Sequence, residues 1–258
     1  MRKQQVIVSL TSFPAAIPFA IQAIRSILDG SVLPDRIVLY LTALQFPNGV
    51  IPSELAELTV NSVFEVRFYN ENIRSYTKLI PALKDFPDDI IITVDDDVWY
   101  HKNMLKLLLR YHKKYPGTII GHRVRRIDRN VGYNAWKVCK RHRYFTRSVK
   151  PSFRNMQTGV GGVLYPPRSL SADMLDCEVF MKMAPTVDDV WFWAAAVANG
   201  TRIAPVPFGF WRRINLDKPS ELSLKNTNIH SGVDVNRTVL ESIIEKYPII
   251  RQRFASES

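Results

Sequence analysis

Residues 90–100 (IIITVDDDVWY) constrain the fold more than any other stretch of this chain, because an apolar β-branched run leads directly into three aspartates. A run of this kind is typical of a buried strand in a parallel sheet. In open α/β folds ligands bind outside the carboxyl ends of such strands, which is where Asp95, Asp96 and Asp97 are expected. The sequence therefore predicts an α/β fold with a binding site at the end of this strand.

The three aspartates have the chemistry of a metal site. Side chains at i and i+2 of an extended segment share a face, so Asp95 and Asp97 are predicted to converge on one hard divalent cation, Mn²⁺ or Mg²⁺. Asp96 would then point elsewhere. A solvated acidic turn that closes a strand explains the same residues, since short motifs recur by chance. The rest of the chain has to separate these two interpretations.

The composition is that of an ordinary globular protein, with 46% hydrophobic and 23% charged residues in a chain of 258. No apolar stretch approaches the roughly 20 residues needed to cross a bilayer, and the amino-terminal sequence lacks the apolar core and cleavage site of a signal peptide. Cys139 and Cys177 are too few and too far apart for a disulfide framework or a cysteine zinc site. We expect a cytoplasmic protein, either free or peripheral on the inner face of the cell membrane.

Positive charge is concentrated in residues 121–154. The formal net charge is +11, and this segment holds eleven basic residues against Asp128 alone. The basic residues are Arg123, Arg125, Arg126, Arg129, Lys137, Lys140, Arg141, Arg143, Arg147, Lys150 and Arg154. Such a segment attracts nucleic acid, anionic lipid headgroups or a phosphorylated glycolipid, although a solvated surface hairpin explains the same charge. We predict a basic, hairpin-like insertion.

Strand and helix signals alternate through the first half, which is typical of βαβ units and a mostly parallel sheet. Strands are predicted over residues 5–10, 36–41, 64–69, 90–94 and about 118–122. Helices are predicted over residues 15–28, 52–58, 75–83, about 103–115, 188–199 and 235–247. Ser75 is the predicted N-cap of the third helix, Gly200 ends the fifth and Pro248 stops the sixth.

Several motifs in this order resemble bacterial GT-A-fold glycosyltransferases over residues 6–207. They are a strand ending in SLTSFP, a lysine-bearing SYTKLIPAL helix, the TVDDDVWY strand end, a TGVGGVLYPP turn and a PTVDDVWFW helix start. The likeness is closest to enzymes that assemble lipopolysaccharide or capsular glycans, in which an aspartate triad of this kind is the DxD motif. The resemblance implies one domain with a central, mostly parallel mixed sheet flanked by helices.

The same resemblance implies a function. Residues 1–122 would be the nucleotide-sugar-binding half, and residues 123–258 the acceptor-binding half with a carboxyl-terminal tail. The enzyme would use Mn²⁺ or Mg²⁺ to move a hexose from a nucleotide sugar, with UDP favoured, to a hydroxyl of a glycan or an anionic glycolipid. Its role would be in bacterial surface polysaccharide synthesis, and no nucleic acid partner is expected.

The resemblance also implies the donor site. Asp97 would contact the metal, Asp95 would complete the coordination or hold the ribose hydroxyls, and His230 would be a third metal ligand. The nucleotide sugar would lie against residues at the ends of the first strand and of the acidic strand, and against a helix start: Thr11, Ser12, Phe13, Lys78, Asp95 and Asp96. On the residues alone, Lys78 is as well explained as a surface lysine, and His230 as an exposed loop histidine.

A second acidic pair, Asp188 and Asp189, would serve the acceptor. Asp189 matches the position of a general base that takes the proton from the acceptor hydroxyl, which would make the enzyme inverting. Asp188 would bind donor-sugar hydroxyls, and Trp191 would stack on a sugar ring. Helix capping explains both aspartates, and core packing explains the tryptophan. Gly161 and Gly162 would allow the acceptor to approach closely, although a tight bend explains them equally well.

Two other functions stay open on the sequence. A metal-dependent nuclease or nucleotidyltransferase also uses clustered carboxylates and a line of basic residues. In such an enzyme Asp188 and Asp189 would have no obvious role, and the chain has no G-x-x-x-x-G-K-[ST] loop. A non-enzymatic polyanion-binding protein would use residues 121–154 and would lose affinity with added salt. It would leave both aspartate clusters unexplained.

Overall fold

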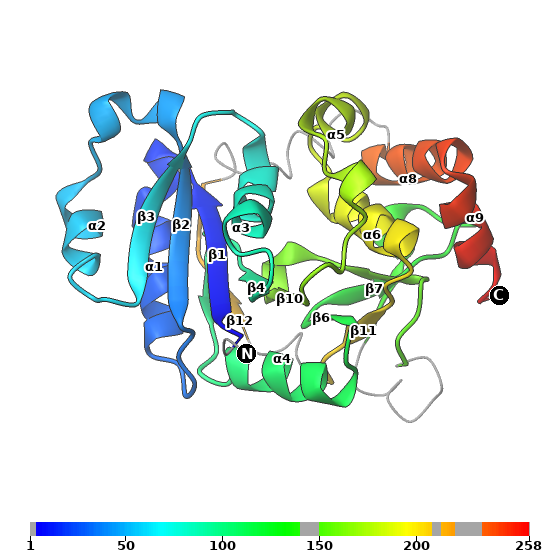
Figure 1. Cartoon of the computed structure of the whole chain (residues 1–258), viewed down its shortest axis with the longest axis horizontal. Helices are drawn as coiled ribbons and strands as arrows, with labels where there is room; N and C mark the ends of the chain where they lie inside the picture. Colours follow the sequence, from blue (N-terminus) through cyan, green and yellow to red (C-terminus); the bar gives the residue numbers. More distant parts are fainter. Residues whose placement is uncertain (1–3, 140–149, 208–212, 220–233, 258) are drawn as a thin grey trace.

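The computed structural model describes residues 4–139, 150–207, 213–219 and 234–257 (Figure 1). Its centre is a sheet of seven strands in the order β11-β6-β10-β4-β1-β2-β3. The strands are β1 (Val6–Ser12), β2 (Arg36–Thr42), β3 (Phe64–Tyr69), β4 (Ile90–Thr93), β6 (Ile119–Gly121), β10 (Val163–Tyr165) and β11 (Ile203–Pro205). Every pairing in this sheet is parallel except those of β10, which runs antiparallel to both β4 and β6. The predicted mostly parallel mixed sheet is confirmed.

Helices cover both faces of this sheet (Figure 1). They are α1 (Ile17–Leu28), α2 (Ser53–Leu58), α3 (Ile80–Asp85), α4 (Met104–Lys114), α5 (Cys177–Met183), α6 (Asp188–Asn199), α8 (Val235–Lys246) and α9 (Pro248–Ala255). Successive strand residues point to opposite faces, so Ile91 packs in the core under α3, α6, α8 and α9, whereas Ile90 and Ile92 pack in the core under α1, α2 and α4. Burial on both faces explains why the strand reads as a continuous apolar run.

Most of the predicted elements are found within a few residues of their expected bounds. Strand β3 and helix α6 match the predicted ranges, and Gly200 ends α6 in the left-handed conformation with φ +84°. Pro248 stops α8 but also begins α9, which was not predicted. A proline fits the first turn of a helix because the missing N–H would have no partner there. Helix α5 was not predicted either.

The helix predicted over residues 75–83 is broken. A 3₁₀ helix (Arg74–Lys78) precedes α3, and the change occurs just before Pro81. Proline has no N–H to donate and clashes with the preceding turn of an α-helix, so one continuous helix cannot pass through it. Ser75 is not the N-cap, because its hydroxyl has no hydrogen-bond partner and Ile73 precedes the first turn.

The acidic residues do not extend the strand as predicted. Strand β4 ends at Thr93, and residues 95–97, which we call the acidic turn, lead into the short strand β5 (Val98–Tyr100). The argument that Asp95 and Asp97 share one face of an extended segment therefore does not apply. Strand β5 leaves the central sheet and pairs antiparallel with β12 (Arg213–Asn215).

The basic segment contributes to a separate antiparallel sheet in the order β8-β7-β9. Its strands are β7 (Val124–Arg126), β8 (Lys137–Val138) and β9 (Asn155–Gln157). The hairpin-like character is confirmed for the pairing of β7 with β8. Residues 140–149, which carry four of the basic side chains, lie outside the described residues. Short 3₁₀ helices complete the described part: Pro14–Ala16, Ala43–Gln45, Pro47–Gly49, Tyr133–Ala135, Gly159–Gly161 and Ala172–Met174.

No helix within the described ranges is both long enough and apolar enough to cross a membrane.

Candidate functional site

The strand order places the candidate site. After β1 the chain adds β2 and β3 on one side, and it then returns to add β4 on the other side of β1. Such a reversal opens a crevice at the carboxyl ends of the two adjacent strands, and ligands of open α/β sheets bind there. Here those ends are Ser12 of β1 and Thr93 of β4, immediately before the acidic turn.

The middle residue of the acidic turn is buried and has both carboxylate oxygens in use. Ser12 Oγ donates to Asp96 Oδ2 at 2.6 Å, and Lys218 Nζ donates to Asp96 Oδ1 at 3.0 Å. Asp96 was predicted to bind the nucleotide sugar as well as to point away from the metal. The residue is only 8% exposed, so its carboxylate points into the protein, which agrees with the second expectation. Direct contact of Asp96 with the nucleotide sugar stays a prediction.

The two outer aspartates are partly exposed. The Asp95 N–H donates to the hydroxyl of Tyr100 at 2.8 Å, which fixes the backbone at the start of the turn. The carbonyl of Asp97 accepts from the N–H of Leu216 at 2.9 Å. The turn is therefore held from β5 and from residues 213–219, and the outer carboxylates stay at the crevice.

Lys78 joins the acidic turn to the second acidic pair. Its ammonium donates to Asp95 Oδ1 at 3.0 Å and lies 3.0 Å from Asp188 Oδ2, and its side chain is only 9% exposed. The contact with Asp188 is an ion pair without hydrogen-bond geometry. Burial lowers the pKa of Lys78, but Asp188 and Asp95 outweigh it and raise the pKa well above its ordinary value. Lys78 is therefore a buried cation, not the surface lysine that the sequence allowed.

Asp188 and Asp189 begin α6 but do not cap it, because Val187 is the N-cap and no side chain bonds there. Asp188 faces Lys78, and Asp189 Oδ1 accepts from the N–H of Gly159 at 3.0 Å. Burial first, and then the neighbouring charge of Asp188, raise the pKa of Asp189 to about 7, against opposing effects of Lys78 and Gly159. Asp189 therefore changes protonation near neutral pH, as a general base needs.

The TGVGGVLYPP turn contains Gly159, Gly161 and Gly162, and only Gly159 lies against the acidic residues of the candidate site. A Cβ on Gly159 would lie 2.8 Å from Lys78 Nζ and 2.9 Å from Asp95 Oδ1, so the bare backbone allows that pair to form. A Cβ on Gly161 would instead meet the backbone N of Arg123 at 3.0 Å, and Gly162 adopts φ +87°. For Gly161 and Gly162 the bend explains the glycine, and their contact with the acceptor stays a prediction.

Trp191 lies in the core and not at the site. Its side chain is completely buried, and its indole N–H donates to the carbonyl of Met174 at 2.7 Å. Trp193 is equally buried and donates to the carbonyl of Phe153 at 2.8 Å. Neither ring has a face open to a sugar. The prediction that Trp191 stacks on a sugar ring is therefore wrong for this conformation, and core packing explains both tryptophans.

The predicted nucleotide-binding residues at the end of β1, Thr11, Ser12 and Phe13, all have intramolecular contacts. Thr11 Oγ1 donates to the carbonyl of Tyr40 at 2.8 Å, and Ser12 is bonded to Asp96. The ammonium of Lys218 lies 5.1 Å from the ring centre of Phe13, which is itself partly exposed. Phe13 is thus the one member of this set with an aromatic surface at the crevice.

The described arginines of the basic segment bind mostly within the protein. Arg125 is buried and donates to the carbonyls of Tyr133 and Trp136 at 3.1 and 3.0 Å. The others contact an acid, polar side chains or a ring: Arg129 with Glu241, Arg126 with Ser152 and Asn155, Arg123 with Thr158, and Arg154 with Phe254. Their charge is therefore less available to a polyanion than the sequence indicated. Lys137 and Lys150 are exposed.

The acidic turn offers carboxylate oxygens to a metal ion. Within the described residues, however, no three or more His, Cys, Asp or Glu side chains are arranged to hold a metal ion. Asp95 and Asp97 supply the hard oxygen atoms that Mn²⁺ and Mg²⁺ prefer, and both are partly exposed. The remaining ligands would have to come from substrate, water or residues not described here. His230, the predicted third ligand, lies outside the described residues.

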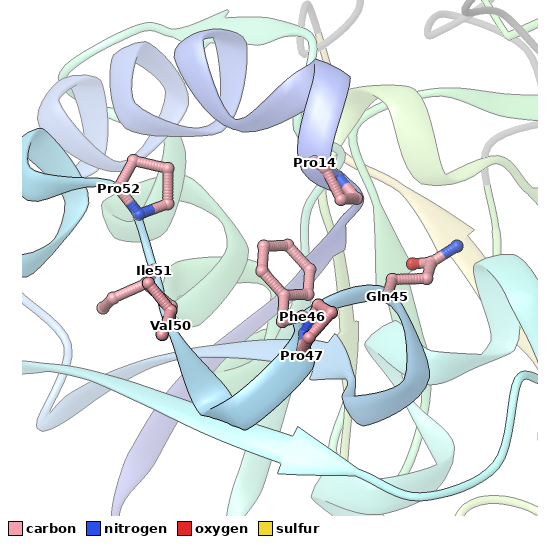
Figure 2. A pocket seen from close by; sticks show the side chains of 7 residues that line it. All are labelled: Pro14, Gln45, Phe46, Pro47, Val50, Ile51 and Pro52. Atoms are coloured by element: carbon pink, nitrogen blue, oxygen red, sulfur yellow. The ribbon is translucent and has the colours of Figure 1, made fainter.

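A shallow apolar groove of about 430 Å³ lies beside the site, next to the start of α1 (Figure 2). In this view Phe46 lies between Pro14 on the right and a group of Val50, Ile51 and Pro52 on the left. No aspartate or lysine of the candidate site lines it. The groove therefore gives the acidic residues no enclosed cavity.

Two site residues were missed on the sequence. Lys218 lies in a polar stretch without a motif. Its contacts with Asp96, 122 residues away in the sequence, and with Phe13 identify it. Gly159 lies in the TGVGGVLYPP turn but is not among the site residues predicted from the sequence. The sequence does carry a signal for it, because a glycine between two β-forming segments, here β9 ending at Gln157 and β10, marks a place where another group can approach the backbone closely.

No protein-family model matches this chain, and no curated protein matches its sequence. Among solved structures it is similar to the mannosyltransferase PcManGT from Pyrobaculum calidifontis, determined in complex with GDP-Man and Mn²⁺. The match has a TM-score of 0.52 and 13% sequence identity, and it covers 99% of this chain and 75% of that one. The chain shares the overall α/β fold of this mannosyltransferase. At this identity the likeness establishes the α/β architecture and no residue roles.

Proposed function

We propose that this protein is a metal-dependent glycosyltransferase that moves a hexose from a nucleotide sugar to a hydroxyl group of a glycan or glycolipid. The observation that carries the proposal is the meeting of two acidic clusters at one buried lysine, Lys78, within a glycosyltransferase fold. Transfer needs oxygen ligands for a cation on the donor side and a base on the acceptor side. The acidic turn offers the first, and Asp189 offers the second.

On the donor side, Asp97 and Asp95 would hold Mn²⁺ or Mg²⁺ together with the diphosphate of the nucleotide. When bound, the cation acts as a Lewis acid that stabilises the negative charge of the departing diphosphate without proton transfer. The partial exposure of both side chains supports this assignment, as does the Mn²⁺ in the PcManGT complex. His230 stays a proposed third ligand.

On the acceptor side, Asp189 would take the proton from the attacking hydroxyl. The Gly159 N–H holds one of its oxygens, and its pKa of about 7 suits proton transfer at neutral pH. Asp188, fixed by Lys78, would bind hydroxyls of the donor sugar beside it. Direct attack with the help of a base inverts the anomeric configuration, so we propose an inverting reaction.

The nucleobase of the sugar donor and the nature of the acceptor are proposed from the sequence. The resemblance favours UDP, whereas PcManGT was determined with GDP-Man, so UDP and GDP are the two candidate nucleotides. Residues 1–122 would bind the donor, and residues 123–258 the acceptor. The exposed Lys137 and Lys150 support an anionic glycolipid acceptor and contact with the inner membrane surface. A role in bacterial surface polysaccharide synthesis rests on the resemblance alone, because PcManGT comes from an archaeon.

Calorimetric titration of UDP and GDP, each with and without Mn²⁺, tests the donor site. We expect one nucleotide to bind only with Mn²⁺, and we expect Asp97→Ala to abolish this binding. Asp173→Ala, which removes an exposed carboxylate away from the crevice, is the matched control and should bind as the unchanged protein does. Failure of the unchanged protein to bind either nucleotide would overturn the proposal.

Charge reversal at Lys137 and Lys150 tests the acceptor. The double variant should use an anionic glycolipid acceptor less well while hydrolysing the donor sugar at an unchanged rate. Equal loss of both activities would contradict an acceptor role for these lysines.

A further inference from the structure

Asp96 links three parts of the crevice that are distant in sequence. It accepts from Ser12 at the end of β1 and from Lys218, which lies 122 residues further along the chain. The side chains of Asp96 and Lys218 are only 12% and 8% exposed. A buried carboxylate with both oxygens occupied is well suited to fix other groups in place and poorly suited to bind a ligand itself.

Residues 213–219 are attached to the acidic turn at successive points. Strand β12 pairs with β5, the Leu216 N–H donates to the carbonyl of Asp97, and Lys218 then reaches Asp96. From there the Lys218 ammonium lies over the ring of Phe13 at 5.1 Å. The ion pair therefore stands between the two groups proposed to bind the nucleotide, Phe13 and the outer carboxylates of the acidic turn.

The energetics of a buried ion pair favour a positioning role over a purely stabilising one. Such pairs contribute little net stability, because desolvation of two charges offsets their attraction, whereas removing one partner leaves a buried charge without compensation. Their best-attested use is to select one arrangement among several. Here the arrangement selected is that of residues 213–219 against the end of β1.

We propose that Asp96 is a positioning residue, which through Lys218 and Ser12 holds Phe13 and the acidic turn as the two sides of one nucleotide site without touching the nucleotide. This inference rests on the proposed function, because it assigns a role within the donor site. It differs from the role expected for Asp96 on the sequence, which was direct contact with the donor.

A double-mutant cycle tests the inference. The variants are Asp96→Asn, Lys218→Met and the two combined, with Lys218→Arg as the conservative rescue and Asp217→Asn as a control that changes an exposed charge in the same segment. The readout is the Kd of UDP or GDP at fixed Mn²⁺, whichever the unchanged protein binds. Thermal unfolding without nucleotide is measured in parallel.

We expect Asp96→Asn and Lys218→Met each to weaken nucleotide binding by about tenfold. The double variant should bind no more weakly than the weaker-binding single variant, because the two residues act together. Lys218→Arg should bind within about threefold of the unchanged protein, since the charge is retained, and Asp217→Asn should bind equally well. Ser12→Ala keeps both charges and should fold, so it serves as the test if Asp96→Asn or Lys218→Met does not fold. We expect it to weaken nucleotide binding by about threefold.

Variants that unfold at lower temperature but bind the nucleotide normally would overturn the inference and leave the proposed function intact. Additive losses in the double variant would overturn it as well, because independent contacts would then explain the effect. Failure of the unchanged protein to bind either nucleotide would instead overturn the proposed function, so the two failures are distinguishable.

Discussion

The ammonium of Lys78 donates to Oδ1 of Asp95 at 3.0 Å, in a position where the lysine side chain is only 9% exposed. The same ammonium lies 3.0 Å from Asp188 at the start of α6. One cation thus compensates carboxylates from both halves of the chain, and it does so where charges are poorly solvated. The acidic site depends on Lys78 for its stability as well as for its geometry.

Replacing Lys78 by methionine should destabilise the protein, and more so at higher pH. The carboxylates left unpaired cost about 3–5 kcal/mol when ionised in a buried position. Lys78 also lowers the pKa of the neighbouring Asp189, which is about 7. Loss of the lysine raises that pKa further, so the stability of the variant falls as pH rises through it. Urea unfolding at pH 5.5 and pH 8 measures this difference. Lys102→Met, which removes an exposed lysine, should show no pH-dependent loss.

The transfer rate should depend on the protonation of Asp189. With a pKa of about 7, the ionised base is scarce in acid, so kcat/KM should rise about tenfold per pH unit below pH 7 and level off above it. Asp189→Asn should lower kcat by about 10²–10⁴ and remove this pH dependence. Steady-state rates between pH 5 and 9 provide the test, with Asp173→Asn as control. If the Asn variant kept the same pH midpoint, a different group would be the base.

Two glycine substitutions should separate the site from the bend beside it. Gly159→Ala places a Cβ between Lys78 and Asp95, at the flexible ends of both side chains, so it should impair nucleotide binding with Mn²⁺ more than folding. Gly161→Ala meets backbone at 3.0 Å, so it should destabilise the fold by about 1–3 kcal/mol. Calorimetry and thermal unfolding of both variants decide the matter. Equal effects on binding and stability in the two variants would contradict the distinction.

Trp191→Phe should affect stability and spare the acceptor. The change removes an indole donor and leaves the carbonyl of Met174 buried without its partner, at a cost of about 1–3 kcal/mol. The KM for the acceptor should be unchanged, because the ring has no exposed face. Trp193→Phe, which breaks the equivalent bond to Phe153, is the matched comparison. A raised acceptor KM in Trp191→Phe alone would restore the stacking interpretation.

The parts of this fold that could be predicted are those determined by local sequence pattern. The apolar run before the acidic turn gave β4, and the acidic start and glycine end of α6 gave its limits. The helix near Lys78 was misjudged because Pro81 breaks an otherwise suitable pattern. Trp191 was misjudged because α6 is buried on nearly all sides, so periodicity cannot tell a core aromatic from an exposed one.

The candidate site shows the same division. Aspartates and Lys78 could be picked out because residue type and position carry a chemical signal. The sequence does not predict which carboxylate each lysine contacts. Lys78 reaches Asp188, and Lys218 reaches Asp96, only because the sheet brings them together. Such contacts join residues far apart in the chain, and no single-sequence pattern encodes them.

Strand β10 determines how this molecule can be divided. It follows residue 122 in the chain, yet its backbone pairs with β4 on one side and β6 on the other. A fragment ending at residue 122 would expose two strand edges with a missing strand between them, and the complementary fragment would carry an unpaired strand; both would be prone to aggregate. Exchange of whole halves between related enzymes is therefore a poor engineering route. Grafting the turns at the crevice, which leaves every strand in register, is the better one.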